Sequence, residues 1–125
     1  MTLRRALVAD DDPTVRLLAH AALARHGFTV TAVADGGSAL EEFERQAFDI
    51  VLLDVEMPVL DGYRVCTELR RRSERPLPIV LITGHDERAA TVDADAAGAS
   101  DVIVKPVDWC SLGARLLKLM SAQPQ

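Results

Sequence analysis

The sequence has few cysteines, no excess of positive charge and no long hydrophobic run. Its two cysteines, Cys66 and Cys110, occur in no CxxC or Cys/His spacing, which favours two half-buried structural thiols over a metal site. The net charge of −5 argues against a chain that itself grips nucleic acid or an anionic membrane. No apolar run approaches the roughly 20 residues of a membrane helix. The apolar stretch after Arg4 and Arg5 is too short for a signal sequence, so we expect a cytoplasmic protein.

The length of 125 residues suits one domain over 1–125, with its core at about 4–120 and a polar tail at 121–125. Large apolar residues at 50–53 run without alternation and stop at Asp54, which is typical of a strand buried on both faces of a parallel sheet. Further strands are predicted at 7–9, 28–33, 79–82 and 102–104, the second of them at the sheet edge. Because helical segments alternate with these strands, we expect an α/β fold.

The helical segments differ in how they are capped and anchored. Asp12 and Asp61 are expected to cap the first and third helices, and Leu18 and Ala47 to lie on the inward stripes of the first and second. The fourth helix, about 86–97, has Val92 as its one sizeable apolar residue and should be locally weak. The final helix, from about 108, is apolar around more than half its circumference, which predicts either a partner surface or internal packing. An arginine cluster at the end of the third helix is expected to be a solvated helix terminus rather than an anion site: Arg70, Arg71, Arg72 and Arg75.

Polar side chains follow four of the predicted strands directly. They are Asp10 and Asp11, Asp54, Thr83 and Lys105. In a parallel sheet these strand ends share one edge, which is where ligands bind in open α/β sheets. Carboxylates about 4 Å apart repel by about 4 kcal/mol at an effective dielectric near 20, so the cluster must raise a pKa or bind a cation. Oxygen ligands without histidine or thiolate favour Mg²⁺, and an ionised Asp54 beside it predicts a nucleophile for phosphoryl transfer.

These residues and their order resemble the receiver domain of two-component response regulators over about 4–120. The resemblance implies a flavodoxin-like (βα)5 three-layer sandwich with parallel strand order 2-1-3-4-5. It implies that Asp54 is the phosphoacceptor, that Thr83 swings toward the phosphoryl group and that Lys105 pairs with it, with a cis bond between Lys105 and Pro106. The implied Mg²⁺ ligands are Asp10 (through water), Asp11, Asp54 and the backbone carbonyl of Glu56.

The resemblance also implies partners and a mode of action. The phosphoryl donor is expected to be a sensor histidine kinase or a phosphotransfer protein. The signal is expected to leave through the face made by the fourth helix, the fifth strand and the final helix, toward an output domain or a second copy of the chain. The residues from Lys105 to Arg115 are similar to receivers joined to cyclic-dinucleotide enzymes. The domain is expected to be a stoichiometric phosphoacceptor that promotes its own phosphorylation and dephosphorylation, and not an enzyme.

Three positions modify this expectation. Receivers usually carry an aromatic residue three positions before the lysine, where this chain has Val102, so the usual aromatic readout is absent. Glu56 and His85 lie where family members tune the lifetime of the aspartyl phosphate, and His85 is equally well explained as a solvated loop residue.

Two other functions use similar residues. A Mg²⁺-dependent phosphatase of the haloacid-dehalogenase type also has a nucleophilic aspartate, a threonine, a lysine and an acid pair, and Asp54-x-Glu56 imitates its first motif. That family places the nucleophile first and the acid pair last, the reverse of the order here. A receiver fold used only as a docking scaffold, without phosphate, is the third hypothesis. Retention of all the acids, Thr83 and Lys105 speaks against it, and Val102 speaks mildly for it.

Overall fold

The computed structural model describes residues 4–84 and 86–121, in which strands and helices alternate. The strands are β1 (Arg4–Ala9), β2 (Phe28–Val33), β3 (Ile50–Asp54), β4 (Ile79–Thr83) and β5 (Asp101–Val104). The helices are α1 (Pro13–Ala24), α2 (Gly36–Arg45), α3 (Gly62–Arg72), α4 (Glu87–Ala97) and α5 (Trp109–Ser121). Of the expected polar tail, Ser121 ends α5 and residues 122–125 lie outside the described residues, as does His85.

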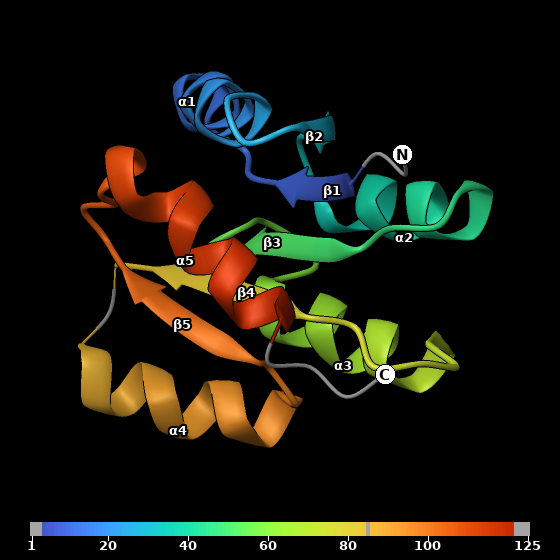
Figure 1. Cartoon of the computed structure of the whole chain (residues 1–125). Coiled ribbons are helices and arrows are strands. Elements are labelled where there is room, and N and C mark those ends of the chain that lie inside the picture. Colours follow the sequence, from blue (N-terminus) through green and yellow to red (C-terminus); the bar gives the residue numbers. More distant parts are fainter. Residues whose placement is uncertain (1–3, 85, 122–125) are drawn as a thin grey trace.

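The strands form one parallel sheet in the order β2-β1-β3-β4-β5, which confirms the predicted fold and the place of β2 at an edge (Figure 1). α1 and α5 cover one face of the sheet, and α2, α3 and α4 cover the other. Successive residues of the central strands alternate between these two layers: in β3, Val51 and Leu53 pack toward α2 and α3, whereas Ile50 and Leu52 pack toward α1 and α5. The sheet is therefore buried on both faces, as the apolar run at 50–53 predicts.

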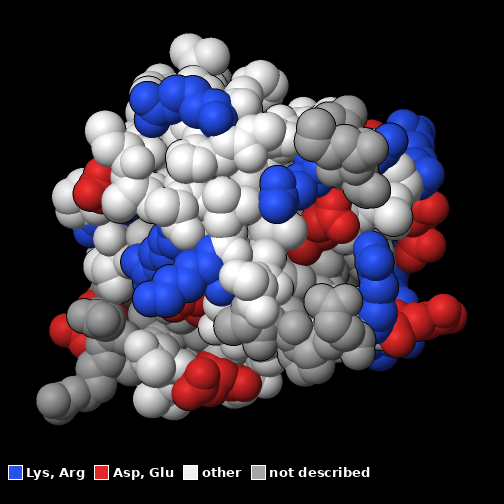
Figure 2. All heavy atoms as spheres, viewed as in Figure 1, with Lys and Arg blue, Asp and Glu red and all other residues white. Residues whose placement is uncertain are grey.

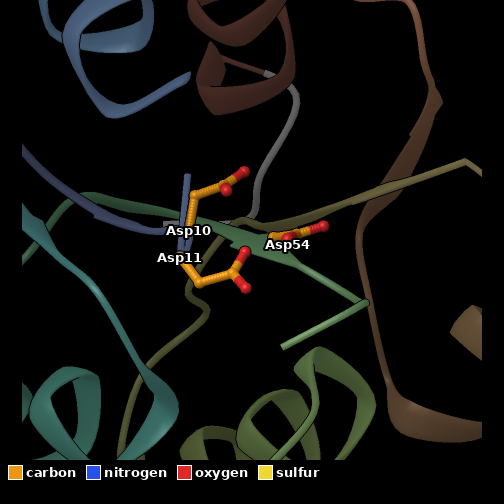
Figure 3. A group of neighbouring side chains, drawn as sticks. All are labelled: Asp10, Asp11 and Asp54. Atoms are coloured by element: carbon orange, nitrogen blue, oxygen red, sulfur yellow. The ribbon is translucent and has the colours of Figure 1, made fainter. Parts of the chain in front are cut away.

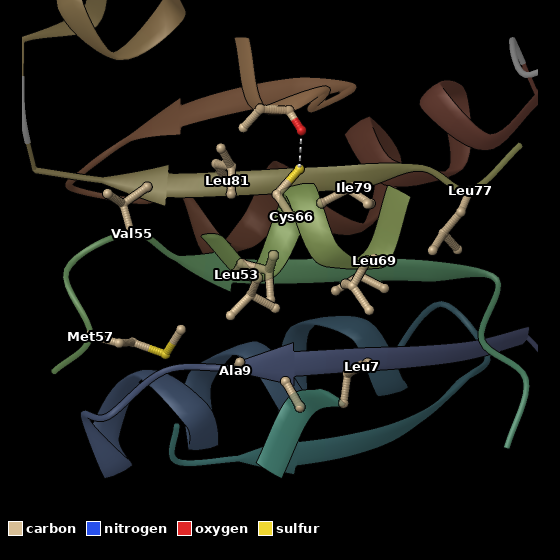
Figure 4. Close-up of a cluster of buried hydrophobic side chains, with 14 of the residues drawn as sticks. Leu7, Ala9, Leu53, Val55, Met57, Cys66, Leu69, Leu77, Ile79 and Leu81 are labelled. Carbon is tan, nitrogen blue, oxygen red and sulfur yellow. Dashed lines mark hydrogen bonds between the residues drawn. The ribbon is translucent and has the colours of Figure 1, made fainter. Parts of the chain in front are cut away.

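The core beneath α3 holds one of the two cysteines (Figure 4). Cys66 is fully buried beside Leu69, and its Sγ donates to the carbonyl of Ala97 at 3.4 Å. Burial raises the pKa of the Cys66 thiol to about 11, so it is protonated and unreactive at neutral pH. Cys66 is a structural thiol, whereas the expectation that Cys110 is half-buried is wrong because it is exposed.

The helix caps are as predicted, but two residues expected to face inward are exposed. The carboxylates of Asp12 and Asp61 accept hydrogen bonds from the first turns of α1 and α3, as predicted. Leu18 is 41% exposed, because α1 packs through Ala19, Ala22 and Leu23 instead. Ala47 is exposed because α2 ends at Arg45, and Phe48 fills the core there.

The two helices expected to form a partner surface pack more closely than their composition suggests. α4 is anchored by the small side chains of Ala90, Ala94 and Ala97, while Val92 is 66% exposed. On α5, Leu112 and Leu116 are buried, and its other large apolar residues are partly buried against the same core: Trp109, Leu117, Leu119 and Met120. Internal packing therefore explains most of the apolar surface of α5. Among the described residues, no helix has the length and apolar character needed to cross a membrane.

Candidate functional site

Polar groups from four strands meet at the carboxyl edge of the sheet. Asp54 is the last residue of β3 and pairs with Ile82, the residue before Thr83 at the end of β4. Asp10 and Asp11 directly follow β1, and Lys105 directly follows β5. Parallel strands bring their carboxyl ends to one edge, so these side chains, distant in sequence, become neighbours.

Three carboxylates lie at the centre of the site (Figure 3). One oxygen from each of Asp10, Asp11 and Asp54 lies within 4.8 Å of the others. Asp10 and Asp54 are only 2% exposed, whereas Asp11 is exposed. Figure 3 shows the three side chains extending to the same side of the sheet edge. The arrangement brings three acidic groups close together, and without a cation their mutual repulsion destabilises the ionised forms.

Lys105, directly after β5, places a positive charge beside the three carboxylates. The Nζ of Lys105 donates to Oδ1 of Asp54 at 3.2 Å, across a bridge that is partly open to solvent on the lysine side. Burial opposes the charge on Lys105, but the hydrogen bond and the negative charge of Asp54 outweigh it and raise the pKa of the lysine. The bond between Lys105 and Pro106 is cis, as the resemblance implies.

Burial and crowding raise the pKa of the two inner acids. The pKa of Asp54 is raised to about 6, by burial first and then by the charge of Asp10, against the opposing effect of Lys105. Burial also raises the pKa of Asp10, although the amide of Asp12 donates to its Oδ1 at 2.9 Å. At pH 7 Asp54 is therefore mostly ionised, but its charge is held at a cost that a cation would relieve.

The donor set fits a hard divalent ion. Oδ2 of Asp10 is buried and has no hydrogen-bond partner among the described residues, which is the state expected of a ligand atom or of an atom bonded to water. Carboxylate oxygens are the ligands that Mg²⁺ prefers. The amide of Glu56 donates to Oδ1 of Asp54 at 3.3 Å, so the Glu56 backbone adjoins the cluster. Its carbonyl as a further ligand stays a prediction.

The side chain of Glu56 makes hydrogen bonds that the sequence does not indicate. Its Oε1 accepts hydrogen bonds from the hydroxyl of Thr83 and from the amide of Gly84, both at 2.8 Å. Burial opposes the charge of Glu56, but these hydrogen bonds outweigh it and lower the pKa of its carboxyl. The position of Glu56 two residues after Asp54 was visible in the sequence, but the direction of its side chain was not.

The raised pKa of Asp54 predicts a change of stability with pH. Since folding raises this pKa from 3.8 to about 6, the folded state binds the proton more tightly, and stability falls as pH rises between these values. Asp54→Asn removes this loss, so we expect it to be more stable than the wild type above pH 6 by about 3 kcal/mol. Urea unfolding in EDTA from pH 4 to 8 measures the difference.

The control for this prediction is Asp95→Asn, which changes an exposed acid of α4 far from the cluster. Its free energy of unfolding should equal that of the wild type at every pH. An Asp54→Asn variant whose stability runs parallel to the wild type across the range would contradict a strained carboxylate at position 54.

Comparisons with known proteins agree with this geometry. The profile of the family described as "Response regulator receiver domain" matches residues 6–117. "Probable transcriptional regulator ycf27" of Cyanophora paradoxa is 38% identical over 117 residues, which cover 94% of this chain and 48% of the relative. "Response regulator PleD" of Caulobacter vibrioides is 42% identical over 117 residues, covering 92% of this chain and 26% of the relative. The chain thus spans less than half the length of either relative.

Solved structures give the same result. The chemotaxis protein CheY4 of Vibrio cholerae superposes with a TM-score of 0.88 at 28% identity, covering 94% of this chain and 99% of that one. A BeF3-activated receiver domain of DrrB superposes with a TM-score of 0.86 at 25% identity, covering 96% and 99%. Sequence profile, relatives, strand order and the acidic strand ends agree, and the chain belongs to the response regulator receiver domain family.

Proposed function

We propose that Asp54 accepts a phosphoryl group in a Mg²⁺-dependent reaction, with a sensor histidine kinase or a phosphotransfer protein as donor. The observation that carries the proposal is the convergence of Asp54 with Asp10, Asp11 and Lys105 at one sheet edge. In the reaction, a carboxylate oxygen of Asp54 forms a bond to phosphorus while the bond from phosphorus to the donor breaks. The donor's leaving group keeps the electron pair.

Each neighbouring residue has a defined task in this proposal. Asp10, Asp11, Asp54 and the Glu56 carbonyl would hold the Mg²⁺. The chemistry such an ion supplies is neutralisation of the phosphoryl oxygens, which are otherwise repelled by the three acids. Lys105 already contacts Asp54 and would pair with the new negative charge on it. Thr83, at the end of the adjacent strand, supplies a hydroxyl donor.

The protein would act as a switch and not as an enzyme, because one phosphoryl group is taken up per chain and then lost by hydrolysis. We propose that the signal leaves through α4, β5 and α5. The exposed Val92 on α4 and the bidentate contact of Arg115 with Asp101, which ties α5 to β5, support a partner surface there. An output domain, a cyclic-dinucleotide enzyme among them, or a second copy of the chain would bind this face.

Direct contact with nucleic acid is not part of the proposal. The chain carries a net charge of −5. On the face shown in Figure 2, lysines and arginines form separate patches, divided by uncharged and acidic residues. A continuous basic surface, which binding to a phosphate backbone requires, is absent from that view.

The family match gives no support to the phosphatase alternative, whose motifs run in the opposite order. A docking scaffold without phosphate would have no use for two carboxylates, Asp10 and Asp54, whose pKa values are raised chiefly by burial, at a cost in stability. A phosphorylation switch is consistent with the family match and gives the two buried carboxylates a use.

The test is to mix the protein with Mg²⁺ and acetyl phosphate and to measure intact mass over time. The proposal predicts a gain of one phosphoryl group, stable in acid, lost in base and absent when EDTA replaces Mg²⁺. Asp54→Ala should show no gain. Asp49→Ala is the matched control, because Asp49 adjoins the opposite end of β3, where it accepts from the amide of Arg5 at 2.8 Å, and it should be modified like the wild type.

Each other outcome points to one alternative. Steady turnover of a generic phosphatase substrate, lost in Asp54→Ala, would favour the enzyme. No modification of the wild type under any of these conditions would favour the scaffold.

A further inference from the structure

The Glu56 carboxylate ties together two loops on either side of the proposed phosphorylation site. Glu56 belongs to the segment after β3, and its Oε1 accepts from the Thr83 hydroxyl at the end of β4 and from the next amide, Gly84. Both bonds are 2.8 Å long, within the normal range for hydrogen bonds in proteins. Thr83 is fully buried, so its hydroxyl is directed by these neighbours and not by solvent.

The hydroxyl of Thr83 cannot serve two acceptors at once. A threonine hydroxyl has one hydrogen to donate, and here Glu56 accepts it. Asp54 lies beside Thr83 in the sheet, since it pairs with Ile82 in the register of β3 and β4. A phosphoryl group on Asp54 would bring new acceptor oxygens to the same hydroxyl, in direct competition with the Glu56 carboxylate.

The aromatic residue that usually moves when the threonine changes its acceptor is absent from this chain. Val102 stands on β5 where the family resemblance would place an aromatic ring, and it is packed partly buried against the core. The group whose hydrogen bonds change directly when Thr83 changes its acceptor is its present partner, Glu56. Glu56 is in contact with Thr83 already and sits at the surface, where a change in its bonds can be sensed.

We propose that Glu56 is a positioning residue that holds Thr83 in the inactive arrangement and is released when Asp54 carries a phosphoryl group. This inference rests on the proposed function, because it assumes an anionic group on Asp54. Transfer of the Thr83 hydroxyl from Glu56 to that group removes one of the two hydrogen bonds by which Glu56 links the segment after β3 to the end of β4, and leaves the bond from the Gly84 amide. In this chain the loss of the Thr83 bond at the Glu56 carboxylate takes the place of the aromatic readout.

Equilibrium binding of beryllofluoride, a phosphoryl mimic, tests the proposal in the presence of Mg²⁺. Binding is followed by the fluorescence of Trp109, the one tryptophan of the chain, or by fluorine NMR. Glu56→Ala releases Thr83 beforehand, and we expect it to bind beryllofluoride about tenfold more tightly, the factor that a hydrogen bond to a charged group is worth. In a Thr83→Ala background the same substitution should change the affinity by less than about twofold.

Glu56→Gln is the matched control, because its amide oxygen still accepts from Thr83 and Gly84 while the charge is gone. We expect Glu56→Gln to keep part of the hydrogen bonding to Thr83 and Gly84, and its affinity for beryllofluoride to rise less than that of Glu56→Ala. Equal gains from Glu56→Ala in the wild-type background and in the Thr83→Ala background would show that Glu56 acts only through its charge and would overturn the proposal. Failure of the wild type to bind beryllofluoride would instead contradict the proposed phosphorylation of Asp54.

Discussion

Replacing Asp11 with alanine is expected to weaken Mg²⁺ binding by about 100-fold while leaving the fold as stable as before. Asp11 is exposed at the end of β1, and its carboxylate faces those of Asp10 and Asp54. Each unit-charge attraction at about 4 Å is worth about 4 kcal/mol at an effective dielectric near 20, and a water molecule recovers only part of it. Without the ion, the same substitution relieves repulsion among the three acids, and this relief offsets the packing that the Asp11 side chain provides. Mg²⁺ titration by calorimetry and urea unfolding in EDTA measure the two effects.

The neighbouring residue provides a control with the opposite pattern. Asp12 lies outside the carboxylate cluster and caps α1 by accepting from the amide of Thr14 at 2.9 Å. Asp12→Ala should cost about 1 kcal/mol of stability and leave Mg²⁺ affinity nearly unchanged. If Asp11→Ala unfolds the protein while metal affinity is retained, Asp11 is a structural residue and its assignment as a ligand is wrong.

Replacing Arg70 with methionine is expected to lower the free energy of unfolding by about 3 kcal/mol, because it removes three hydrogen bonds to partly buried acceptors. The guanidinium donates to the carbonyl of Gly98 at 2.6 Å, to the carbonyl of Leu77 and to the hydroxyl of Ser100 at 2.9 Å. It therefore joins α3 to the entrance of β4 and to the turn between α4 and β5. Methionine keeps much of the packing of the side-chain stem, so the change isolates the hydrogen bonds. Urea unfolding at pH 7 measures the difference.

Arg71→Met is the matched control one residue along the same helix. Arg71 is exposed and pairs only with Glu68 among the described residues, so its replacement should leave the unfolding curve nearly unchanged. Similar unfolding curves for the two variants would contradict a structural role for Arg70. The expectation of a solvated arginine cluster is wrong for Arg70 because its reach across the turn at Gly98 depends on tertiary packing.

The sheet was predictable because burial on both faces leaves a simple pattern in the sequence. The apolar runs ending at Ala9, Leu53 and Ile82 locate the carboxyl ends of three strands to within one residue. The helix faces were less predictable, since α1 packs largely and α4 wholly through alanines, which leaves Leu18 and Val92 exposed. Val59 is a further surprise: it is fully exposed with a φ of 69°, a conformation that a β-branched residue rarely adopts.

The site was predictable where side chains follow strand ends and unpredictable where they lie in loops. Asp10, Asp11, Asp54 and Lys105 meet because the register of a parallel sheet fixes where each strand ends. The bond from Thr83 to Glu56 depends on how the segment after β3 folds back, through the contact of the Gly62 amide with the carbonyl of Val55 at 3.1 Å. Sequence spacing alone does not determine such a path.

The most direct test of the central claim is to locate the phosphoryl group on the chain. The protein is phosphorylated by acetyl phosphate with Mg²⁺, the acyl phosphate is reduced with borohydride, and peptide mass spectrometry identifies the residue converted. The account predicts conversion of Asp54 alone, with Asp10 and Asp11 unmodified. Conversion of either of those acids in place of Asp54, or of a residue away from this edge of the sheet, would contradict it.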